Sequence, residues 1–222
     1  MCEICTEISG VGHRDLLVEL LGGNPGSWVL FESSHFAVLP SVGPLVAGHV
    51  LICPRRHTNR LASVYLDEVG DLKRTKATVA NVLEAVFGSP VQFFEHGASV
   101  DGQYVPCTVT HAHLHALPVR PIWPELPTSL TWDAVSSTPT ALARHVGDNE
   151  YLYYEGSDGN AVVATKVGLR IESQLLRRVI AEQLGHPTEW NWREYPRTEL
   201  LRRTCEALAP AFSSWSMSSV AR

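Results

Sequence analysis

The stretch Thr110-His111-Ala112-His113-Leu114-His115-Ala116-Leu117-Pro118 decides the interpretation of the fold, because three histidines occupy alternate positions in it. Successive side chains of an extended strand point to opposite faces, so the three imidazoles would line one side, roughly 6–7 Å apart. The small or apolar residues between them would face the core. We therefore expect a strand whose polar face carries catalytic or metal-binding imidazoles. The alternative is a solvated strand face that happens to use histidine.

Strand-like and helical patterns surround this stretch. Residues 28–31, 35–39, 50–53 and 91–94 are short apolar runs typical of strands. Within residues 66–87, apolar side chains recur at three, four or seven positions, which predicts one long helix. Strands, one long helix and then further strands predict an α+β fold, in which an antiparallel sheet packs on the helix.

The composition changes after Pro118. Residues 121–127 contain three prolines and predict a linker. We therefore expect a first domain over residues 1–120 and a C-terminal α/β extension over residues 121–222. The elements expected in the extension are a hairpin of two strands and two amphipathic helices, over residues 150–154, 161–164, 173–184 and 198–208.

Charge and hydropathy exclude two classes of partner. The net charge is −5, which disfavours general binding of nucleic acid through charge. No apolar run approaches the roughly 20 residues that a membrane-spanning helix needs, so we expect no membrane partner. The first residues lack the basic and apolar regions of a secretory signal, and we expect a cytoplasmic protein.

The five cysteines are an odd number for a disulfide framework. In a reducing compartment, the Cys2-x-x-Cys5 pair indicates metal ligation or redox chemistry rather than a structural bridge. A thioredoxin-type pair follows a strand, and no strand precedes this one, so metal ligation is the better interpretation.

A second histidine cluster lies upstream, where Gly48-His49 opens an apolar strand that leads into Pro54-Arg55-Arg56-His57. Together with the three alternate histidines, the following Pro118 and the N-terminal CxxC pair, this element resembles the histidine triad (HIT) family of nucleotide hydrolases and nucleotidyltransferases. The resemblance covers about residues 1–120. It implies the histidine triad fold for that part of the chain.

The resemblance implies that His113, the middle histidine, is the nucleophile. It would attack the α-phosphorus of a nucleotide, expel the leaving group and form a nucleotidyl-imidazole intermediate. A backbone carbonyl would hold the other ring nitrogen of His113. His115 would donate to phosphate oxygens, and His49 would hold His115 from the neighbouring strand. The alternative for His49 is a surface imidazole near a turn.

The resemblance also implies a structural zinc ion. Zinc-containing members use the CxxC pair, the histidine of the Pro-x-x-His element and the first triad histidine as ligands. The corresponding residues are Cys2, Cys5, His57 and His111, a set that suits a closed tetrahedral site. His96 is an alternative ligand, and a metal-free CxxC pair on a mobile tail is the other alternative.

Five further residues bear on substrate binding. Cys107 and Thr108 stand where many members carry glutamine and serine before the triad, so Thr108 retains a hydroxyl for the phosphate. Ser41 replaces an acidic residue that binds ribose hydroxyls in many members. In the extension, Gln174 and Arg177 could close over the active site and hold a phosphate, or form a solvated helix face.

These observations predict a phosphorus-transfer enzyme with a nucleotide as its small-molecule substrate. The leading substrate classes are dinucleoside polyphosphates and nucleoside phosphoramidates. Family members commonly dimerise, so the resemblance implies a possible homodimer. The alternative functions are a nucleotide-binding protein of the same fold without turnover, and a hydrolase whose histidines hold a catalytic metal. A nucleic-acid-binding zinc module is disfavoured because the chain is acidic and has one CxxC pair.

Overall fold

The structure is a computed structural model that describes residues 2–12, 14–100, 110–120, 126, 128, 130–165 and 171–220. Its centre is an eight-stranded sheet in the order β1-β2-β3-β5-β4-β7-β8-β6, in which all described pairs are antiparallel. The strands are β1 (Phe31–Glu32), β2 (Phe36–Pro40), β3 (Val50–Pro54), β4 (Val91–Gly97), β5 (Leu114–Pro118), β6 (Asp133–Val135), β7 (Tyr151–Glu155) and β8 (Ala161–Thr165).

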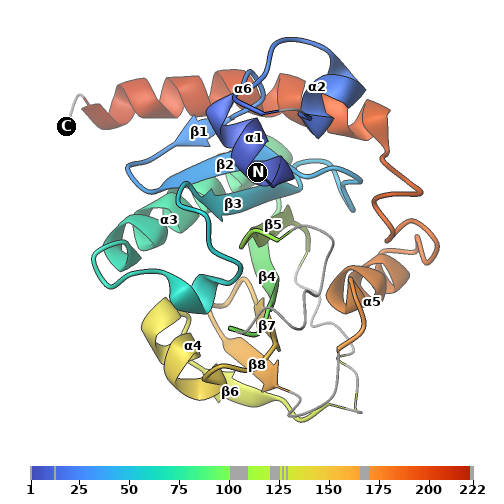
Figure 1. Ribbon diagram of the computed structural model, residues 1–222. Helices are drawn as coiled ribbons and strands as arrows, with labels where there is room; N and C mark the ends of the chain where they lie inside the picture. Colours follow the sequence, from blue (N-terminus) through green and yellow to red (C-terminus); the bar gives the residue numbers. More distant parts are fainter. Residues whose placement is uncertain are drawn as a thin grey trace.

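Helices cover both faces and one edge of this sheet (Figure 1). They are α1 (Glu3–Ser9), α2 (Leu16–Leu21), α3 (Val69–Phe87), α4 (Pro139–Val146), α5 (Leu175–Gln183) and α6 (Thr198–Val220), with a 3-10 turn η1 (Leu61–Ser63). In Figure 1, α6 crosses the end of the molecule where β1 lies, and α4 lies at the opposite end with β6 and β8. None of the helices in the described ranges combines the length and the apolar character that crossing a membrane requires.

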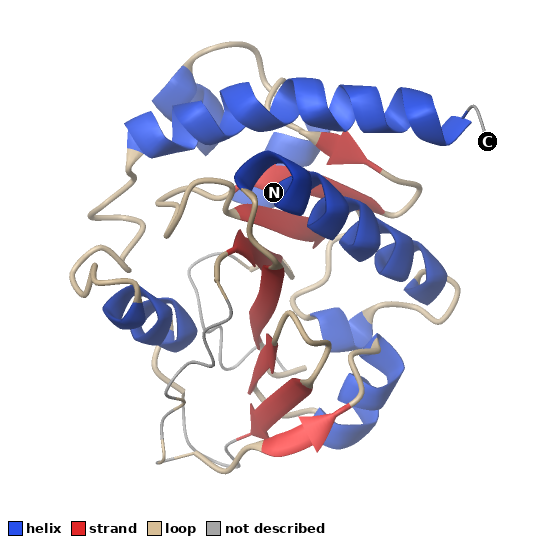
Figure 2. Cartoon of the chain, turned by 180° about the vertical axis from the view of Figure 1, so that it is seen from behind, coloured by secondary structure: helices blue, strands red, loops and turns tan. Residues whose placement is uncertain are grey.

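One face of the sheet packs on α3, which stands in front of the strands in the view from behind (Figure 2). Alternate strand residues point to this face, as the two-residue period of a strand requires. The shared core includes Val38, Ile52, Leu114 and Ala116 from the strands and Val79 and Leu83 from α3. The residues between them therefore point to the opposite face.

That opposite face is covered by two separate apolar clusters. Near β2 and β3, Leu39 and Cys53 pack with Ile4 of α1 and Leu17 of α2. Near β4 and β7, the second cluster includes Phe94 and Leu117 from the sheet and Leu176 and Ile180 from α5. His115 points to this face from β5, next to Leu117, so the histidine stretch lies where the two clusters meet.

The predicted α+β class and the packing of an antiparallel sheet on one long helix are confirmed. The hairpin and the first helix of the extension are present as β7, β8 and α5. The hairpin adds strands to the same sheet through β4, with Phe94 opposite Tyr154. The division of the chain at residue 120 stays a prediction.

The histidine stretch itself departs from the prediction. Strand β5 begins at Leu114, so His115 is a strand residue and the two preceding histidines belong to the irregular segment before it. This segment is held by the N–H of Ala112, which donates to the carbonyl of Thr58 at 2.6 Å. The three imidazoles consequently do not line one strand face, and each has a different environment.

Four elements of the described chain were not predicted from the sequence: α1, η1, α4 and β6. The last helix, α6, also continues beyond the predicted end at residue 208, through Pro210. Proline lacks an N–H and disfavours a helix interior. Here Leu208 and Phe212 on either side of it are buried in the core against α3, and this burial favours the longer helix.

Candidate active site and metal cluster

His115 and His49 form a buried pair of imidazoles. His49 is fully buried next to the first residue of β3, and its Nε2 lies 2.9 Å from Nδ1 of His115. Gly48 places His49 there: it has φ +82°, and a Cβ at this position would come within 2.5 Å of the Phe87 ring. The N–H of Gly48 donates to the hydroxyl of Thr204 in α6 at 3.1 Å.

The partners of this pair fix which nitrogen carries each proton. The N–H of Leu45 donates to Nδ1 of His49 at 3.1 Å, so that nitrogen has its lone pair free to accept. In a neutral ring, Nε2 of His49 then carries the hydrogen and donates it to His115 Nδ1. His115 is left with an N–H at Nε2. Its ring also stacks on Phe94, with centroids 4.2 Å apart.

His113 has the opposite arrangement. Its Nδ1 lies 2.7 Å from the carbonyl oxygen of His111, and a carbonyl can only accept, so Nδ1 carries the hydrogen. In the neutral ring, Nε2 of His113 is therefore unprotonated. The ring meets that of His115 edge to face, with centroids 5.0 Å apart. One pocket consequently contains both an unprotonated nitrogen and an N–H donor.

The electrostatic environment keeps these imidazoles neutral. Burial lowers the pKa of His113, and electrostatic interactions with Arg177 and His96 lower it further, while the bond to the His111 carbonyl raises it. Burial also lowers the pKa of His49 and of His115 well below the ordinary histidine value. A neutral imidazole is the nucleophilic form, so the ring of His113 is suited to attack near pH 7.

A pocket opens beside His113 and His115, and Arg177 of α5 lines it. The Arg177 side chain is buried, and its guanidinium donates to the carbonyls of Trp190 at 2.9 Å and Gly43 at 2.5 Å. These two bonds hold a positive charge next to the histidines. A fixed guanidinium of this kind suits an anionic group such as phosphate.

The N-terminal helix lines another part of this pocket, with Glu3, Ile4 and Glu7. Burial raises the pKa of the Glu7 carboxyl to about 8, and the charges of Asp15 and Glu3 add to the shift. The other lining residues are Leu16, Pro40, Ser41, Val42, Leu51 and Trp192.

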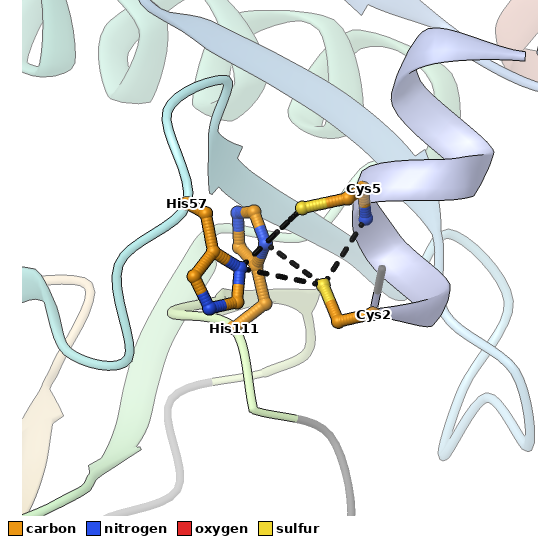
Figure 3. Close-up of side chains that lie close together, drawn as sticks. All are labelled: Cys2, Cys5, His57 and His111. Carbon is orange, nitrogen blue, oxygen red and sulfur yellow. Dashed lines mark hydrogen bonds between the residues drawn. The ribbon is translucent and has the colours of Figure 1, made fainter. Parts of the chain in front are cut away.

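A second group of side chains lies where the start of α1 meets the segment before β5 (Figure 3). Cys2, Cys5, His57 and His111 each offer one ligand atom, and these four atoms lie within 4.8 Å of one another. The Sγ atom of Cys5 is 3.4 Å from Nδ1 of both histidines, and that of Cys2 is 3.5 Å and 3.4 Å from them. This group could hold a metal ion, and it unites the four ligands expected from the sequence.

The partners of His111 prepare it for such a role. Its Nε2 donates to the carbonyl of Pro54 at 2.7 Å, which leaves Nδ1 unprotonated and facing the two sulfurs. Burial lowers the pKa of His111 to about 4, so the ring is neutral. A histidine ligand whose second nitrogen donates to a backbone carbonyl is the usual arrangement at protein metal sites.

Several candidates from the sequence lie elsewhere. Gln174, at φ +58°, is not among the described residues that line the pocket, and its amide donates to Asn191 at 3.4 Å. His96, the alternative metal ligand, instead bonds to the carboxylate of Glu150 at 2.9 Å. Cys107 and Thr108 lie outside the described residues.

Sequence reasoning missed the part of the pocket that α1 lines. Two signals could have located this helix: Cys2 and Cys5 are three residues apart, a spacing that places both on one face of a helix, and Gly10 ends it in the left-handed conformation. The Phe94 ring behind His115 was also missed. It follows from strand register, since Phe94 stands opposite His115 in the sheet.

Comparison with known proteins identifies a domain within this chain. Residues 24–122 match the family model described as HIT domain. The chain is 31% identical over 100 residues to a bis(5'-adenosyl)-triphosphatase of Dictyostelium discoideum, covering 42% of this chain and 64% of that protein. It is 33% identical over 94 residues to an asymmetrical bis(5'-nucleosyl)-tetraphosphatase of Schizosaccharomyces pombe, covering 42% of this chain and 50% of that one. The chain thus spans less than two thirds of the length of either relative.

Two solved structures are also similar to part of this chain. The NitFhit protein of C. elegans has 28% sequence identity and a TM-score of 0.38, over 43% of this chain and 23% of that chain. A zinc-bound histidine triad family protein of Mycobacterium smegmatis has 21% identity and a TM-score of 0.37, over 50% of this chain and 78% of that chain.

Proposed function

Residues 24–122 of this chain form a HIT domain, and on that premise we propose that the protein is a nucleotide hydrolase or nucleotidyltransferase that acts through His113. The observation that carries the proposal is the pair of imidazoles in one pocket: His113 with an unprotonated Nε2, and His115 with an N–H at Nε2. The names of the two relatives support a substrate of the dinucleoside polyphosphate class, and nucleoside phosphoramidates are the second class we propose.

The reaction proceeds in two displacements. Nε2 of His113 attacks the α-phosphorus, a P–N bond forms, and the bond from phosphorus to the leaving group breaks. The leaving group departs with the electron pair of that bond and takes up a proton from solvent. Water or another acceptor then attacks the phosphorus and releases a proton to solvent, the P–N bond breaks, and the nucleotidyl group leaves with that acceptor. The imidazole returns to its neutral form, with Nδ1–H still bonded to the His111 carbonyl.

Two groups stabilise the charge on phosphorus during these steps. The N–H of His115 donates to a phosphate oxygen or to the leaving group, and His49 behind it fixes the direction of that donor. The Arg177 guanidinium supplies positive charge that does not need to reorganise, because two backbone carbonyls already hold it. Residues 121–222 thus contribute to the site as an extension that covers it. Contacts of Cys107, Thr108 and Gln174 with the substrate stay predictions.

We also propose that Cys2, Cys5, His57 and His111 bind one structural zinc ion. With Zn–S bonds of about 2.3 Å and Zn–N bonds of about 2.0–2.1 Å, the sulfur-to-nitrogen edge of a tetrahedral site is about 3.6 Å. The corresponding distances here are 3.4–3.5 Å. Four protein ligands complete the tetrahedron, which favours a structural ion over a catalytic ion with an open position. The ion would cross-link the N-terminal helix to the segment before β5.

Intact-mass spectrometry after rapid quenching tests the proposed reaction. We would mix the protein with a dinucleoside polyphosphate or a nucleoside phosphoramidate and look for the mass of one nucleotidyl group. We expect this adduct on the wild type and on His145→Ala, which changes an exposed histidine paired with Asp133 on the far part of the sheet. We expect none on His113→Ala. An adduct that persists on His113→Ala would overturn the assignment.

A further inference from the structure

Helix α1 belongs to both groups of side chains at this site. Cys2 and Cys5 contribute two of the four atoms of the cluster, while Glu3, Ile4 and Glu7 of the same helix line the pocket beside His113. Any change in the position of α1 therefore changes one wall of the pocket. The cluster and the pocket are physically coupled through seven residues of helix.

The helix depends on a few contacts for its position. An isolated helix of seven residues is unstable in water, because helix nucleation is costly. The Sγ of Cys2 caps the helix by accepting from the N–H of Cys5 at 3.3 Å. Ile4 packs in the cluster that contains Leu39 and Cys53. The Cys/His cluster joins the start of α1 to the histidine stretch.

Glu7 is the more buried of the two carboxyl groups that this helix contributes to the pocket, the other being Glu3. The Glu7 side chain is 7% exposed, and its carboxyl accepts from the backbone N–H of Leu17. The neighbouring wall residues, Ile4, Leu16 and Val42, are apolar, so they suit the uncharged part of a ligand. A carboxyl group in such surroundings is matched best by a hydrogen-bond donor of that ligand.

Different walls of the pocket therefore present different chemical groups to a ligand. Arg177, with its fixed positive charge, lies beside the histidines and favours the phosphate of a nucleotide. On another wall, the Glu7 carboxyl offers an acceptor oxygen to the hydroxyl or amino donors of the nucleoside. The two groups line the same pocket, so a nucleotide can satisfy both with its two ends.

We propose that α1, held by the Cys/His cluster, is a wall of the substrate pocket on which Glu7 acts as a specificity-determining residue for the donor groups of the nucleoside. This inference rests on the proposed function, because it assigns the remaining part of the same substrate. It also gives the cluster a role in ligand affinity: a metal ion in the cluster fixes α1, and its removal weakens nucleoside binding without touching His113.

Equilibrium binding tests this inference without using turnover. We would measure by titration calorimetry the binding of AMP, 2'-deoxy-AMP and IMP to the full-length, zinc-loaded protein. We expect AMP to bind to the wild type, and we expect at least one of the two analogues, which lack a sugar hydroxyl or the base amino group, to bind more weakly. In Glu7→Ala we expect AMP to bind roughly ten-fold more weakly and the difference between AMP and that analogue to disappear.

Controls separate recognition from simple damage to the fold. Glu7→Gln keeps an acceptor oxygen and should restore part of the AMP affinity. Glu19→Gln makes the same substitution at an exposed position of α2, where Glu19 pairs with Arg14, and should bind AMP as the wild type does. A purely structural role for Glu7 would weaken all three ligands equally in Glu7→Ala, and that result would overturn the inference. Failure of the wild type to bind AMP would overturn it as well.

The role of the cluster is tested on zinc-free protein and on Cys5→Ser. We expect both to bind AMP more weakly by a similar factor, with faster amide hydrogen exchange in residues 3–9. Unchanged AMP affinity after loss of zinc would show that the cluster does not hold the wall. The proposed function is judged separately, since its failure would appear as the absence of a His113 adduct on the wild type, whatever the binding data are.

Discussion

His111 and His113 are two residues apart, yet they present opposite ring nitrogens. His111 donates from Nε2 to the carbonyl of Pro54 and turns an unprotonated Nδ1 toward the cysteines. His113 donates from Nδ1 to the carbonyl of His111 and leaves Nε2 unprotonated in the pocket. The carbonyl that each ring meets therefore decides its chemistry. The path of the backbone before β5 separates a candidate metal ligand from a candidate nucleophile.

The largest expected effect comes from exchanging the two histidines for alanine one at a time. In His113→Ala we expect nucleotide turnover to fall by about a thousand-fold or more, because the nucleophile is lost, while zinc content stays at one ion per chain. In His111→Ala we expect zinc content to fall and some turnover to remain. The measurements are initial rates and metal analysis of the same preparations. Equal losses of zinc in both variants would show that the two histidines are not separate in role.

Zinc removal should reduce the free energy of unfolding by a few kcal/mol. The cluster joins α1 to the histidine segment, and metal binding at a preformed set of ligands stabilises the folded state. We expect thermal unfolding of the wild type to move to lower temperature on chelation. Cys5→Ser, which already lacks one ligand, should show little further change. If chelation leaves the unfolding temperature of the wild type unchanged, a metal ion at this cluster does not stabilise the protein.

The sequence predicted the sheet and α3 well, because their signals are local. Apolar residues with a period of two or of about 3.6 produced β2, β3, β4 and α3. The interpretation of the triad as one strand was wrong. The cause is a contact with a residue distant in sequence, which a local pattern of residues does not reveal. The N–H of Ala112 bonds to Thr58, which is distant in sequence, and this bond belongs to the irregular path of the first two histidines.

The sequence predicted most side chains of the candidate site, but it did not predict the helix that lines one wall of the pocket. The four members of the metal cluster were expected, and the structure brings them together. The wall formed by Glu7 was not expected, since nothing in the sequence near residue 7 shows that α1 lies next to β2 and β3. Arg177 was expected to hold phosphate, but its bond to Gly43 depends on tertiary packing.

The hydrogen bond between His49 and His115 provides a third test of whether the partner of an imidazole determines its role in turnover. In His49→Leu, His115 loses the donor to its Nδ1 and is no longer held with its N–H toward the substrate. We expect turnover to fall by roughly ten- to a hundred-fold, at the lower end of what a positioned proton donor contributes. His49→Gln, which can offer an N–H donor, should recover part of the rate. Identical rates in the two variants would argue against this hydrogen bond as the cause.

The smallest expected effect is a change of stability with pH. Burial lowers the pKa of His49 and His115 well below the ordinary value, while in the unfolded chain both have a pKa near 6.5. The stability due to their neutral forms is thus complete above about pH 6.5 and is lost as the pH falls toward the folded pKa values, because the unfolded chain then binds more protons.

Denaturant unfolding of zinc-loaded protein at pH 7.5 and pH 5.5 would measure this loss, which we expect to be roughly 1 kcal/mol for each of the two histidines. The double variant His49→Leu/His115→Leu retains Cys2, Cys5, His57 and His111, so any part of the pH dependence due to zinc binding is common to both proteins. The difference between the two slopes then belongs to the histidine pair. If the double variant loses as much stability as the wild type between these pH values, the pair is not held neutral by the fold, and the assignment of an N–H donor to His115 loses its electrostatic basis.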